Sequence, residues 1–534
     1  MSDGSSNKSG RTRTTNSTWF GETNILPLCA FRSVLGFILI FWYVDLLPDF
    51  KFFFSESGPF PHDVLLRERS SYLFSLLDWT GSDLITIGFF LLGLLAAACL
   101  LLGWHSRVAS VINFIVLVSL QNRNLLPWDG ADNVIRVTSF WLMFCPIQRA
   151  YSIDALQAMR RGSPFSINAS ALGLRLLQLQ IGCVYLVSAW AKLHGLAWLN
   201  GGALYYALNM GPAWSRSLAP VLSHFPLVVL VGTVGTLLFE ILFLPLVFSP
   251  WGQPWLKLLA LIWGASFHVI IALTLKLGWF SYVMLSTYVL FLEPSWIERF
   301  VGHLKPLVIK PVGVLYSQLT KFDDRATAFL SIFRKRLLRR PGTVDLPHPT
   351  HMRPAIRYSY NALLISLFSC ALWFALDPTS KAIHRAIPLP PAVAHFIQSV
   401  GLRQSWQMFS PHPYDFAGYV VVEGDLTNGS VVNLQEAGYA QGGWRPTKPY
   451  YAGWYYSRWT QIFNSMVRDH IYGRSNPYLL PYSDDVCRSY NSDRSAGEPH
   501  LQAIRIIMVR QDTVLPGLQE RDWTHDELLS HYCF

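Results

Sequence analysis

The stretch VYLVSAWAKLHGLAWLNGG, residues 184–202, decides the class of fold. Its first part is a long apolar run, rich enough to lie in lipid, and this run stops at Lys192 and His194. A tryptophan and a pair of glycines follow, and the chain then becomes apolar again. An apolar run that ends on a lysine is typical of a membrane helix reaching the polar surface. The stretch therefore predicts a membrane span with an ammonium group and an imidazole near its end.

The composition of the whole chain supports a protein with several such spans. Hydrophobic residues make up 51% of the 534 residues, and charged residues make up 14%. Soluble globular proteins carry about 25% charged residues. The net charge of +10 does not indicate a nucleic-acid partner, because residues 294–358 alone hold 12 Lys or Arg against 4 Asp or Glu. We expect a mainly α, polytopic membrane helical bundle, with the lipid bilayer as its partner.

A helix needs about 20 mostly apolar residues to cross the hydrocarbon layer. About nine segments meet or approach this length. Residues 62–79 are amphipathic and are expected at the interface, and residues 196–210 are expected to form a re-entrant or surface piece. The nine candidate spans are 26–48, 83–103, 107–122, 133–148, 171–192, 225–248, 255–275, 277–293 and 359–376.

Positive charges predict the orientation of these spans. Residues 1–20 are polar and slightly basic, which is typical of a disordered cytoplasmic tail. Arg149, Arg160 and Arg161 lie in a loop on the same side, as does the basic loop 301–358 with FRKRLLRR at 333–340. Anionic lipid head groups are sufficient partners for such a loop. We expect a cytoplasmic N-terminus and an extracytoplasmic C-terminus.

The region after the last span, residues 377–534, differs from the rest of the chain. Apolar and polar residues alternate over 414–438 around Thr427-Asn428-Gly429, a hairpin signature. Residues 501–514 predict a further strand. We expect a small extracytoplasmic α+β domain. A disulfide between Cys487 and Cys533 and two free thiols remain equal alternatives, and no metal-ligand spacing occurs.

Lys192 has two interpretations. It can reach the interface as an anchor, beside Trp190 and Trp198. Alternatively, its neighbours can remove it from water, so that it takes a proton from a substrate.

Ionisable residues at membrane depth usually face an interior or a cavity. We expect Glu240 to pair with an Arg or His, and Glu240 and Arg32 to hold the bundle together. His268 and Lys276 lie eight residues apart on one helical face, where they either lock helices or line a pocket. The whole set is Arg32, Arg136, Arg175, Glu240, His268 and Lys276.

Several segments resemble a known family. LQLQIGCVYLVSAWAKLHGLAWLNGGAL at 177–204 and SFHVIIALTLKLGWFSYVMLSTYVLFLEPSW at 266–296 resemble the membrane domain of vitamin K-dependent gamma-carboxylases. The broader group is the HTTM (horizontally transferred transmembrane) domain family, which is common in bacteria. QSWQMFSPHPYDFAGYVVVEGDLTNGSVVNL at 404–434 looks like the tail of many such proteins. The resemblance covers roughly residues 20–300, so we take 21–300 as the membrane domain. Residues 359–376 would form a separate last span. We expect the protein in a bacterial inner membrane.

The resemblance implies a site. Lys192 would be the catalytic base that deprotonates reduced vitamin K or another quinol, and His268 would be a second catalytic residue. Trp198, Gly201, Gly202 and Tyr282 would bind the substrate. The family has a further functional histidine, but PIQRAYSIDAL at 146–156 carries Arg149 at the corresponding position, and the long propeptide-binding region is missing.

Two classes of function remain open. The first is a carboxylase-like membrane enzyme that uses Lys192 as general base on a lipid-soluble substrate. The second is a non-enzymatic membrane factor for maturation of, or immunity to, a secreted peptide or partner protein. For the second, SWQMFSPHPYDF at 405–416 is a candidate contact surface, although its aromatic residues could instead pack the tail onto the membrane domain. A transporter ranks last, because no paired broken helices in symmetric halves are visible.

Overall fold

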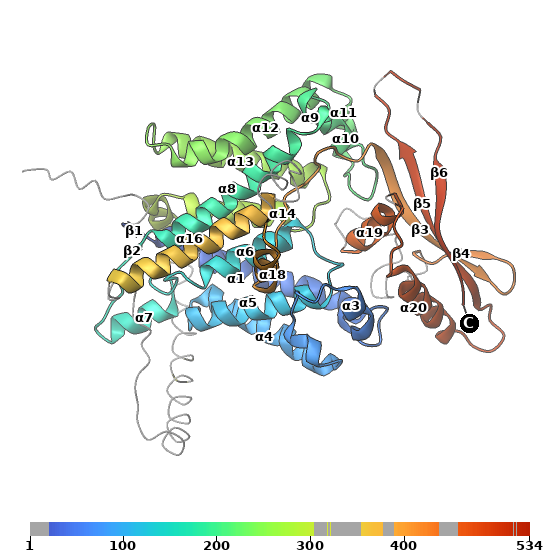
Figure 1. Ribbon diagram of the computed structural model, residues 1–534, viewed down its shortest axis with the longest axis horizontal. Helices are drawn as coiled ribbons and strands as arrows, with labels where there is room; N and C mark the ends of the chain where they lie inside the picture. The colour runs from blue at the N-terminus through green and yellow to red at the C-terminus, as the bar shows by residue number, and fades with distance from the viewer. Residues whose placement is uncertain are drawn as a thin grey trace, which may run out of the picture.

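The computed structural model describes residues 21–303, 354–376, 389–436 and 458–533, apart from positions 472, 516 and 520, together with positions 318 and 321. Those parts form a bundle of helices with a small domain of strands and helices at one end (Figure 1). The predicted tail 1–20 and most of the predicted basic loop 301–358 lie outside the described residues.

Six helices in the described ranges are long and apolar enough to cross a membrane. Each has at least 20 residues, and a rise of about 1.5 Å per residue gives a length near the hydrocarbon thickness. They match six of the nine predicted spans within a few residues. The six are α1 (Leu26–Leu46), α4 (Asp83–Leu102), α8 (Leu172–Lys192), α12 (Pro226–Phe248), α13 (Trp255–Thr274) and α16 (Pro354–Leu376).

The other three predicted spans are helical, but their crossing of the membrane stays a prediction. The first, α5 (Ser106–Arg123), buries polar side chains, and Asn113 accepts a hydrogen bond from the Tyr43 hydroxyl at 3.2 Å. The second, α6 (Gly130–Leu142), has 13 residues and is largely buried. The third consists of α14 (Phe280–Thr287) and the 3₁₀ turn η3 (Tyr288–Phe291).

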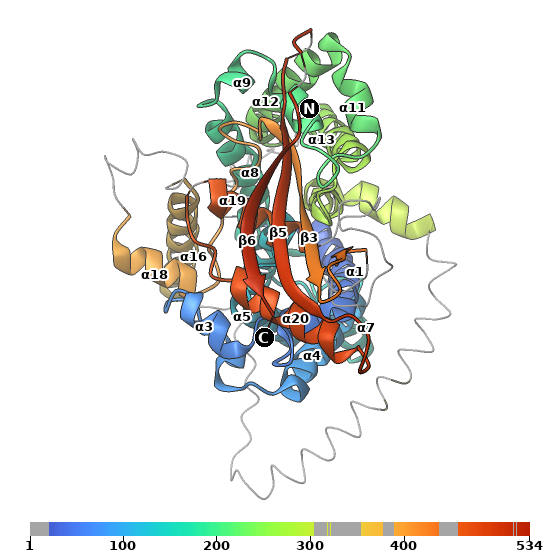
Figure 2. The ribbon, with the colours of Figure 1, turned by 90° about the vertical axis from the view of Figure 1, so that its right-hand side faces the viewer.

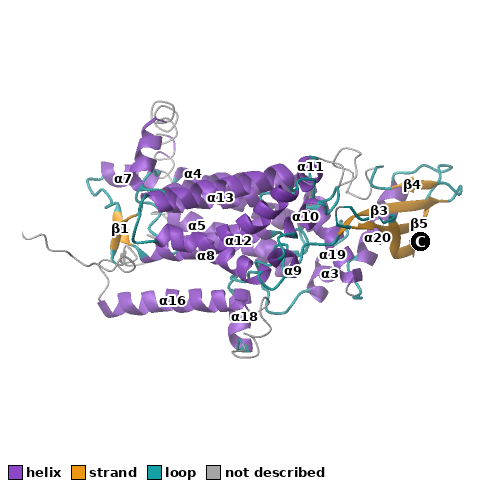
Figure 3. Cartoon of the chain, turned by 90° about the horizontal axis from the view of Figure 1, so that it is seen from above, coloured by secondary structure: helices purple, strands orange, loops and turns teal. Residues whose placement is uncertain are grey.

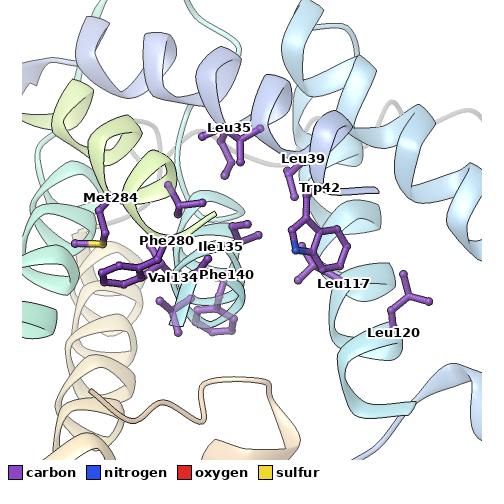
Figure 4. Packing of buried hydrophobic residues seen from close by; sticks show 14 of the residues in the cluster. Leu35, Leu39, Trp42, Leu117, Leu120, Val134, Ile135, Phe140, Phe280 and Met284 are labelled. Atoms are coloured by element: carbon purple, nitrogen blue, oxygen red, sulfur yellow. The ribbon is translucent and has the colours of Figure 1, made fainter. Parts of the chain in front are cut away.

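The bundle is held together by apolar side chains at helical spacing. Leu35, Leu39 and Trp42 form one face of α1 and point toward α5 and α6, as Figure 4 shows. The outer helices α12, α13 and α16 keep most of their apolar surface exposed, which suits contact with lipid tails. In Figure 3, α16 lies at the edge of the bundle.

Residues 389–436 and 458–533 form what we call the tail domain. Its antiparallel sheet has the order β4-β3-β5-β6 and crosses the end of the bundle (Figure 2). The predicted hairpin turn is present, with Gly429 at φ 83°, and Cys487 and Cys533 form a disulfide. The elements are α18 (Pro391–Ser399), β3 (Phe416–Leu426), β4 (Val431–Asn433), α19 (Trp459–Ile471), α20 (Leu479–Ser492), β5 (Leu501–Asp512) and β6 (Thr524–Tyr532).

Short elements connect the long helices. At the end of the bundle opposite the sheet, Figure 1 shows β1, β2 and α7. The predicted surface piece 196–210 contains α9 and α10, and the predicted interfacial segment 62–79 contains α3 and η2. The connecting elements are β1 (Glu22–Asn24), η1 (Leu47–Asp49), α2 (Phe50–Phe54), α3 (His62–Glu68), η2 (Leu76–Trp79), α7 (Ile153–Arg160), β2 (Asn168–Ser170), α9 (Leu196–Leu199), α10 (Ala203–Leu208) and α11 (Leu218–Ser223).

Candidate functional site

Lys192 ends α8 inside the protein. Its side chain is buried, with the residue 3% exposed, which excludes the surface anchor, one of the two interpretations of Lys192. The Nζ atom donates to Glu240 Oε1 at 2.6 Å and to Ser188 Oγ at 2.5 Å. Because Ser188 lies one turn before Lys192 on α8, the helix itself presents both groups to α12. The structure therefore places an ammonium, a carboxylate and a hydroxyl in direct contact.

Glu240 is the counter-ion in this cluster. We expected an Arg or His partner, but the partner is Lys192, 48 residues away in sequence. The Ser188 hydroxyl also donates to Glu240 Oε1, at 3.1 Å. The second carboxylate oxygen, Oε2, is buried and has no hydrogen-bond partner among the described residues. A buried acceptor without a partner is costly, and this makes Oε2 available to a ligand.

Trp198 covers the ammonium group. The Lys192 Nζ lies 5.0 Å from the centre of the Trp198 ring, within reach of a cation–π interaction. The two predicted glycines follow at the turn between α9 and α10. Gly201 has φ +78°, which favours glycine, and a Cβ there would meet Leu230, whereas a Cβ on Gly202 would meet nothing within 4 Å.

His268, on α13, belongs to a neighbouring cluster that packs against the same face of α8 as Glu240 does. The Tyr185 hydroxyl lies 2.9 Å from His268 Nε2 and 2.7 Å from the Tyr288 hydroxyl. Tyr185 stands seven residues before Lys192, two helical turns along α8. The other ring nitrogen of His268, Nδ1, is buried with no partner among the described residues.

Two further predicted residues lie elsewhere. The Lys276 ammonium donates to the Pro212 carbonyl at 2.6 Å, whereas His268 contacts Tyr185. Tyr282 is 54% exposed on α14 and lies outside both clusters, and its substrate-binding role stays a prediction.

The predicted arginines hold backbone segments in place. Arg149 lies at the β1–β2 end of the structure, away from the tail domain. Each guanidinium binds carbonyl or amide oxygens, as expected for groups that lock a bundle. The contacts are Arg32 to the Tyr151 carbonyl (2.5 Å), Arg136 to the Gly401 carbonyl (2.9 Å), Arg149 to the Ser166 carbonyl (2.9 Å) and Arg175 to Gln178 Oε1 (2.9 Å).

A segment of the tail domain covers the Lys192 turn, and we call residues Gln407–Tyr414 the strap. The Trp198 indole N–H donates to the Phe409 carbonyl at 2.9 Å. A Cβ on Gly195 would stand 1.6 Å from the Pro411 carbonyl oxygen, so the strap touches the chain just after Lys192. Within the predicted patch 405–416, Trp406 is buried, whereas Tyr414 is 37% exposed.

The other face of the strap borders a cavity of about 720 Å³ between the bundle and the tail domain. The bundle contributes Trp128, Asp129 and Phe280 to its wall, and α19 contributes Asn464. The cavity wall does not include Lys192 or His268. The strap therefore separates the Lys192 cluster from a space large enough for a small molecule.

An acidic cluster at the start of α6 was not predicted. Arg458, just before α19, contacts Asp132 at 3.2 Å and Asp45 at 3.6 Å. Trp42 Nε1 donates to Asp132 Oδ1 at 2.6 Å. The sequence signal for this cluster is the capping pair Asp129 and Asp132 at the start of α6. No group of three or more potential metal ligands occurs in the parts of the chain that the structure describes.

The fold defines a multi-pass helical membrane protein with a buried lysine–carboxylate cluster. Residues 66–296 match the family model described as HTTM domain, the family that the sequence resemblance indicated.

Two curated proteins of Bacillus subtilis (strain 168) are similar to the chain. Uncharacterized protein YitO is 28% identical over 202 residues, which are 36% of this chain and 62% of that protein. Sporulation-delaying protein SdpB is 23% identical over 277 residues, which are 49% of this chain and 80% of that protein. The chain thus spans less than two thirds of the length of YitO. No solved structure matches the chain.

Proposed function

We propose that this protein is a membrane enzyme in which Lys192 is the general base for a weakly acidic, lipid-soluble substrate. The observation that carries the proposal is the contact of 2.6 Å between Lys192 Nζ and Glu240 Oε1 inside the protein. Ionisable groups are rarely buried in a membrane domain without a function. The resemblance to gamma-carboxylases supports the same role for Lys192.

Glu240 can accept the proton that Lys192 must release before it acts as a base. A lysine can accept a proton from a substrate only after giving up its own. Glu240 lies close enough to take that proton, which leaves an amine beside a carboxylic acid and no isolated charge in the interior. When the amine then takes the substrate proton, Trp198 lies over the new ammonium group.

A quinol suits the polar atoms that are left over. Glu240 Oε2 and His268 Nδ1 are buried without partners among the described residues, and the His268 ring lies against the rings of Phe267 and Phe280. A quinol hydroxyl would donate a hydrogen bond to Glu240 Oε2, and the quinol ring would pack against the aromatic side chains. When bound, a quinol would supply an acidic hydroxyl group and its redox chemistry. Glutamate carboxylation is not part of the proposal, because Arg149 stands at the position of the family histidine and binds backbone carbonyls.

The test compares variants of the full-length protein. Lipid extracted from the purified wild type and identified by mass spectrometry supplies the substrate, and reduced vitamin K is a second probe. We expect Lys192→Met to abolish turnover, and the double variant Lys192→Met/Glu240→Gln to be folded and equally inactive. The matched control is Lys257→Met, which breaks the Lys257–Glu293 pair elsewhere in the bundle and should leave turnover unchanged. The proposal that the protein is an enzyme would be overturned if Lys192→Met had the turnover of the wild type, or if phospholipid were the only lipid extracted with the protein.

The membrane orientation is a second part of the proposal. We infer that all nine helical segments cross a bacterial inner membrane, with a cytoplasmic N-terminus and an extracytoplasmic tail domain. The disulfide supports this side for the tail domain, because disulfides persist in oxidising compartments. Arg149 precedes α7, Arg160 ends it and Arg161 follows it, and Figure 1 shows α7 at the end opposite the tail domain. Thiol-reactive labelling of single cysteines from each side of the membrane tests the assignment.

The alternative is a non-enzymatic factor for maturation of, or immunity to, a secreted peptide or partner protein. The match to 80% of SdpB favours it, because that name describes a cellular effect rather than a reaction. A factor of this kind would contact its partner through the tail domain. Cellular function that survives Lys192→Met but is lost when strap residues such as Tyr414 are changed would favour this alternative.

A further inference from the structure

The cavity between the bundle and the tail domain contains a carboxylate, that of Asp129, which forms no ion pair with any residue that the structure describes. Asp129 begins α6 as its N-cap, and its Oδ1 accepts from the backbone N–H groups of Ala131 at 2.7 Å and Asp132 at 3.4 Å. Its second oxygen, Oδ2, accepts no hydrogen bond from any residue in the described ranges. Asp129 is part of the cavity wall.

The guanidinium that acts on Asp129 through its charge, that of Arg458, is already paired with two other carboxylates. Arg458 makes its ion pairs with Asp132 and Asp45. Its guanidinium also lies 5.3 Å from the centre of the Trp128 ring. Within the described ranges Asp129 thus has no ion pair, and of these three carboxylates it is the one in the cavity wall.

The other charged residues in the cavity wall do not neutralise the charge of Asp129. The wall carries one more carboxylate, Asp469, which accepts from Asn476 Nδ2 at 2.7 Å, and one guanidinium, that of Arg468, which belongs to an exposed residue. His412 is also present, with Nδ1 2.6 Å from the Pro413 carbonyl. A cation bound inside the cavity would remove the excess negative charge.

Aromatic rings surround the same space. A Cβ on Gly130, next to Asp129, would lie 3.2 Å from the Phe280 ring and 3.5 Å from Met408 Sδ. Trp214, Tyr414 and Tyr478 line the cavity as well. Rings attract cations through their faces, and a carboxylate with several rings is the usual arrangement for binding an organic ammonium.

We propose that this cavity binds a ligand that carries an organic ammonium group, with Asp129 as its counter-ion and the aromatic rings as its walls. The site is distinct from the Lys192 cluster and does not depend on the function proposed above. Two sources can supply such a group, namely a free amine or the head group of a zwitterionic lipid.

The test uses the full-length protein in nanodiscs of phosphatidylglycerol, with choline, ethanolamine and spermidine as probes. We expect at least one of these to raise the thermal unfolding midpoint saturably, and the neutral carbon analogue of choline to have no effect at equal ionic strength. Asp129→Asn keeps the capping oxygen but removes the charge, and it should weaken binding by about tenfold or more. Asp63→Asn, at an exposed aspartate on α3, is the matched control and should bind as the wild type does.

Nanodiscs of phosphatidylcholine separate the two sources. If the lipid head group is the ligand, the effect of free choline disappears in them, and if a free amine is the ligand, the effect persists. The proposal is overturned if none of the three amines shifts the midpoint, if the neutral analogue shifts it equally, or if Asp129→Asn binds as tightly as the wild type.

Discussion

The Trp198 indole donates a hydrogen bond to the Phe409 carbonyl at 2.9 Å, and the same ring lies over the Lys192 ammonium. The tail domain thus holds the residue that covers the candidate base. A ligand or mutation that moves the strap should therefore move Trp198.

Gly195→Ala should displace the strap. The added Cβ would stand 1.6 Å from the Pro411 carbonyl oxygen, and backbone atoms on both sides cannot move cheaply. We expect a loss of about 2 kcal/mol or more in unfolding free energy and faster proteolysis of the tail domain. Gly202→Ala is the control, because its Cβ would meet nothing within 4 Å, and it should change stability by less than about 0.5 kcal/mol. Equal behaviour of the two variants would contradict the contact.

Lys192 and Glu240 should depend on each other for stability. Lys192→Met leaves a buried carboxylate without its partner, at a cost of about 3–5 kcal/mol. Adding Glu240→Gln removes that charge and should recover most of the loss. A double-mutant cycle on unfolding midpoints in detergent measures the coupling. If the second change recovers nothing, the two residues do not form a pair in the folded protein.

Tyr185→Phe should destabilise the protein while leaving its shape intact. The hydroxyl connects His268 with Tyr288, and its removal leaves both without that partner in the interior. A cost of about 1–3 kcal/mol is expected. Tyr282→Phe removes the same atom from a residue that is 54% exposed and should have no measurable effect on thermal unfolding.

The disulfide should stabilise the tail domain against unfolding. Cys487 and Cys533 are separated by 46 positions in sequence, and closing a loop of that length is worth about 4 kcal/mol in the chain-entropy treatment. The double variant Cys487→Ser/Cys533→Ser should lower the unfolding midpoint of the tail domain, and a reducing agent should lower it equally in the wild type. A reducing agent without effect on the wild type would contradict the bond.

Asp129 should make stability depend on pH. Burial, and then the neighbouring Asp132, raises the pKa of Asp129 from 3.8 to about 7, while Arg458 opposes the rise. In that range the folded protein binds a proton that the unfolded chain has lost, so the unfolding free energy falls as pH rises from about 4 to about 7. Unfolding curves at about pH 5 and about pH 8 should differ less in Asp129→Asn than in the wild type. The same slope in both proteins would assign the effect to another group.

Much of the architecture was predictable from local sequence. The apolar run before Lys192 and the turn at Gly429 each depend on residues that are neighbours in the chain, and both were predicted within a few positions. The strand β6 was missed, because THDELLSHY has little apolar alternation and becomes a strand by pairing with β5. Of the two interpretations that the sequence left open for Lys192, burial agrees with the one in which its neighbours remove it from water, and its partner was not predicted.

The sequence by itself determined that the chain is a membrane protein, because hydropathy and length are properties of continuous segments. It also identified Lys192 as the candidate base. Only the tertiary structure decided that Glu240 is its partner, that Trp198 is held by Phe409, and that Asp129 faces a cavity. These contacts join residues from different helices, and helix packing depends on side-chain shape across the whole bundle, which no single segment encodes.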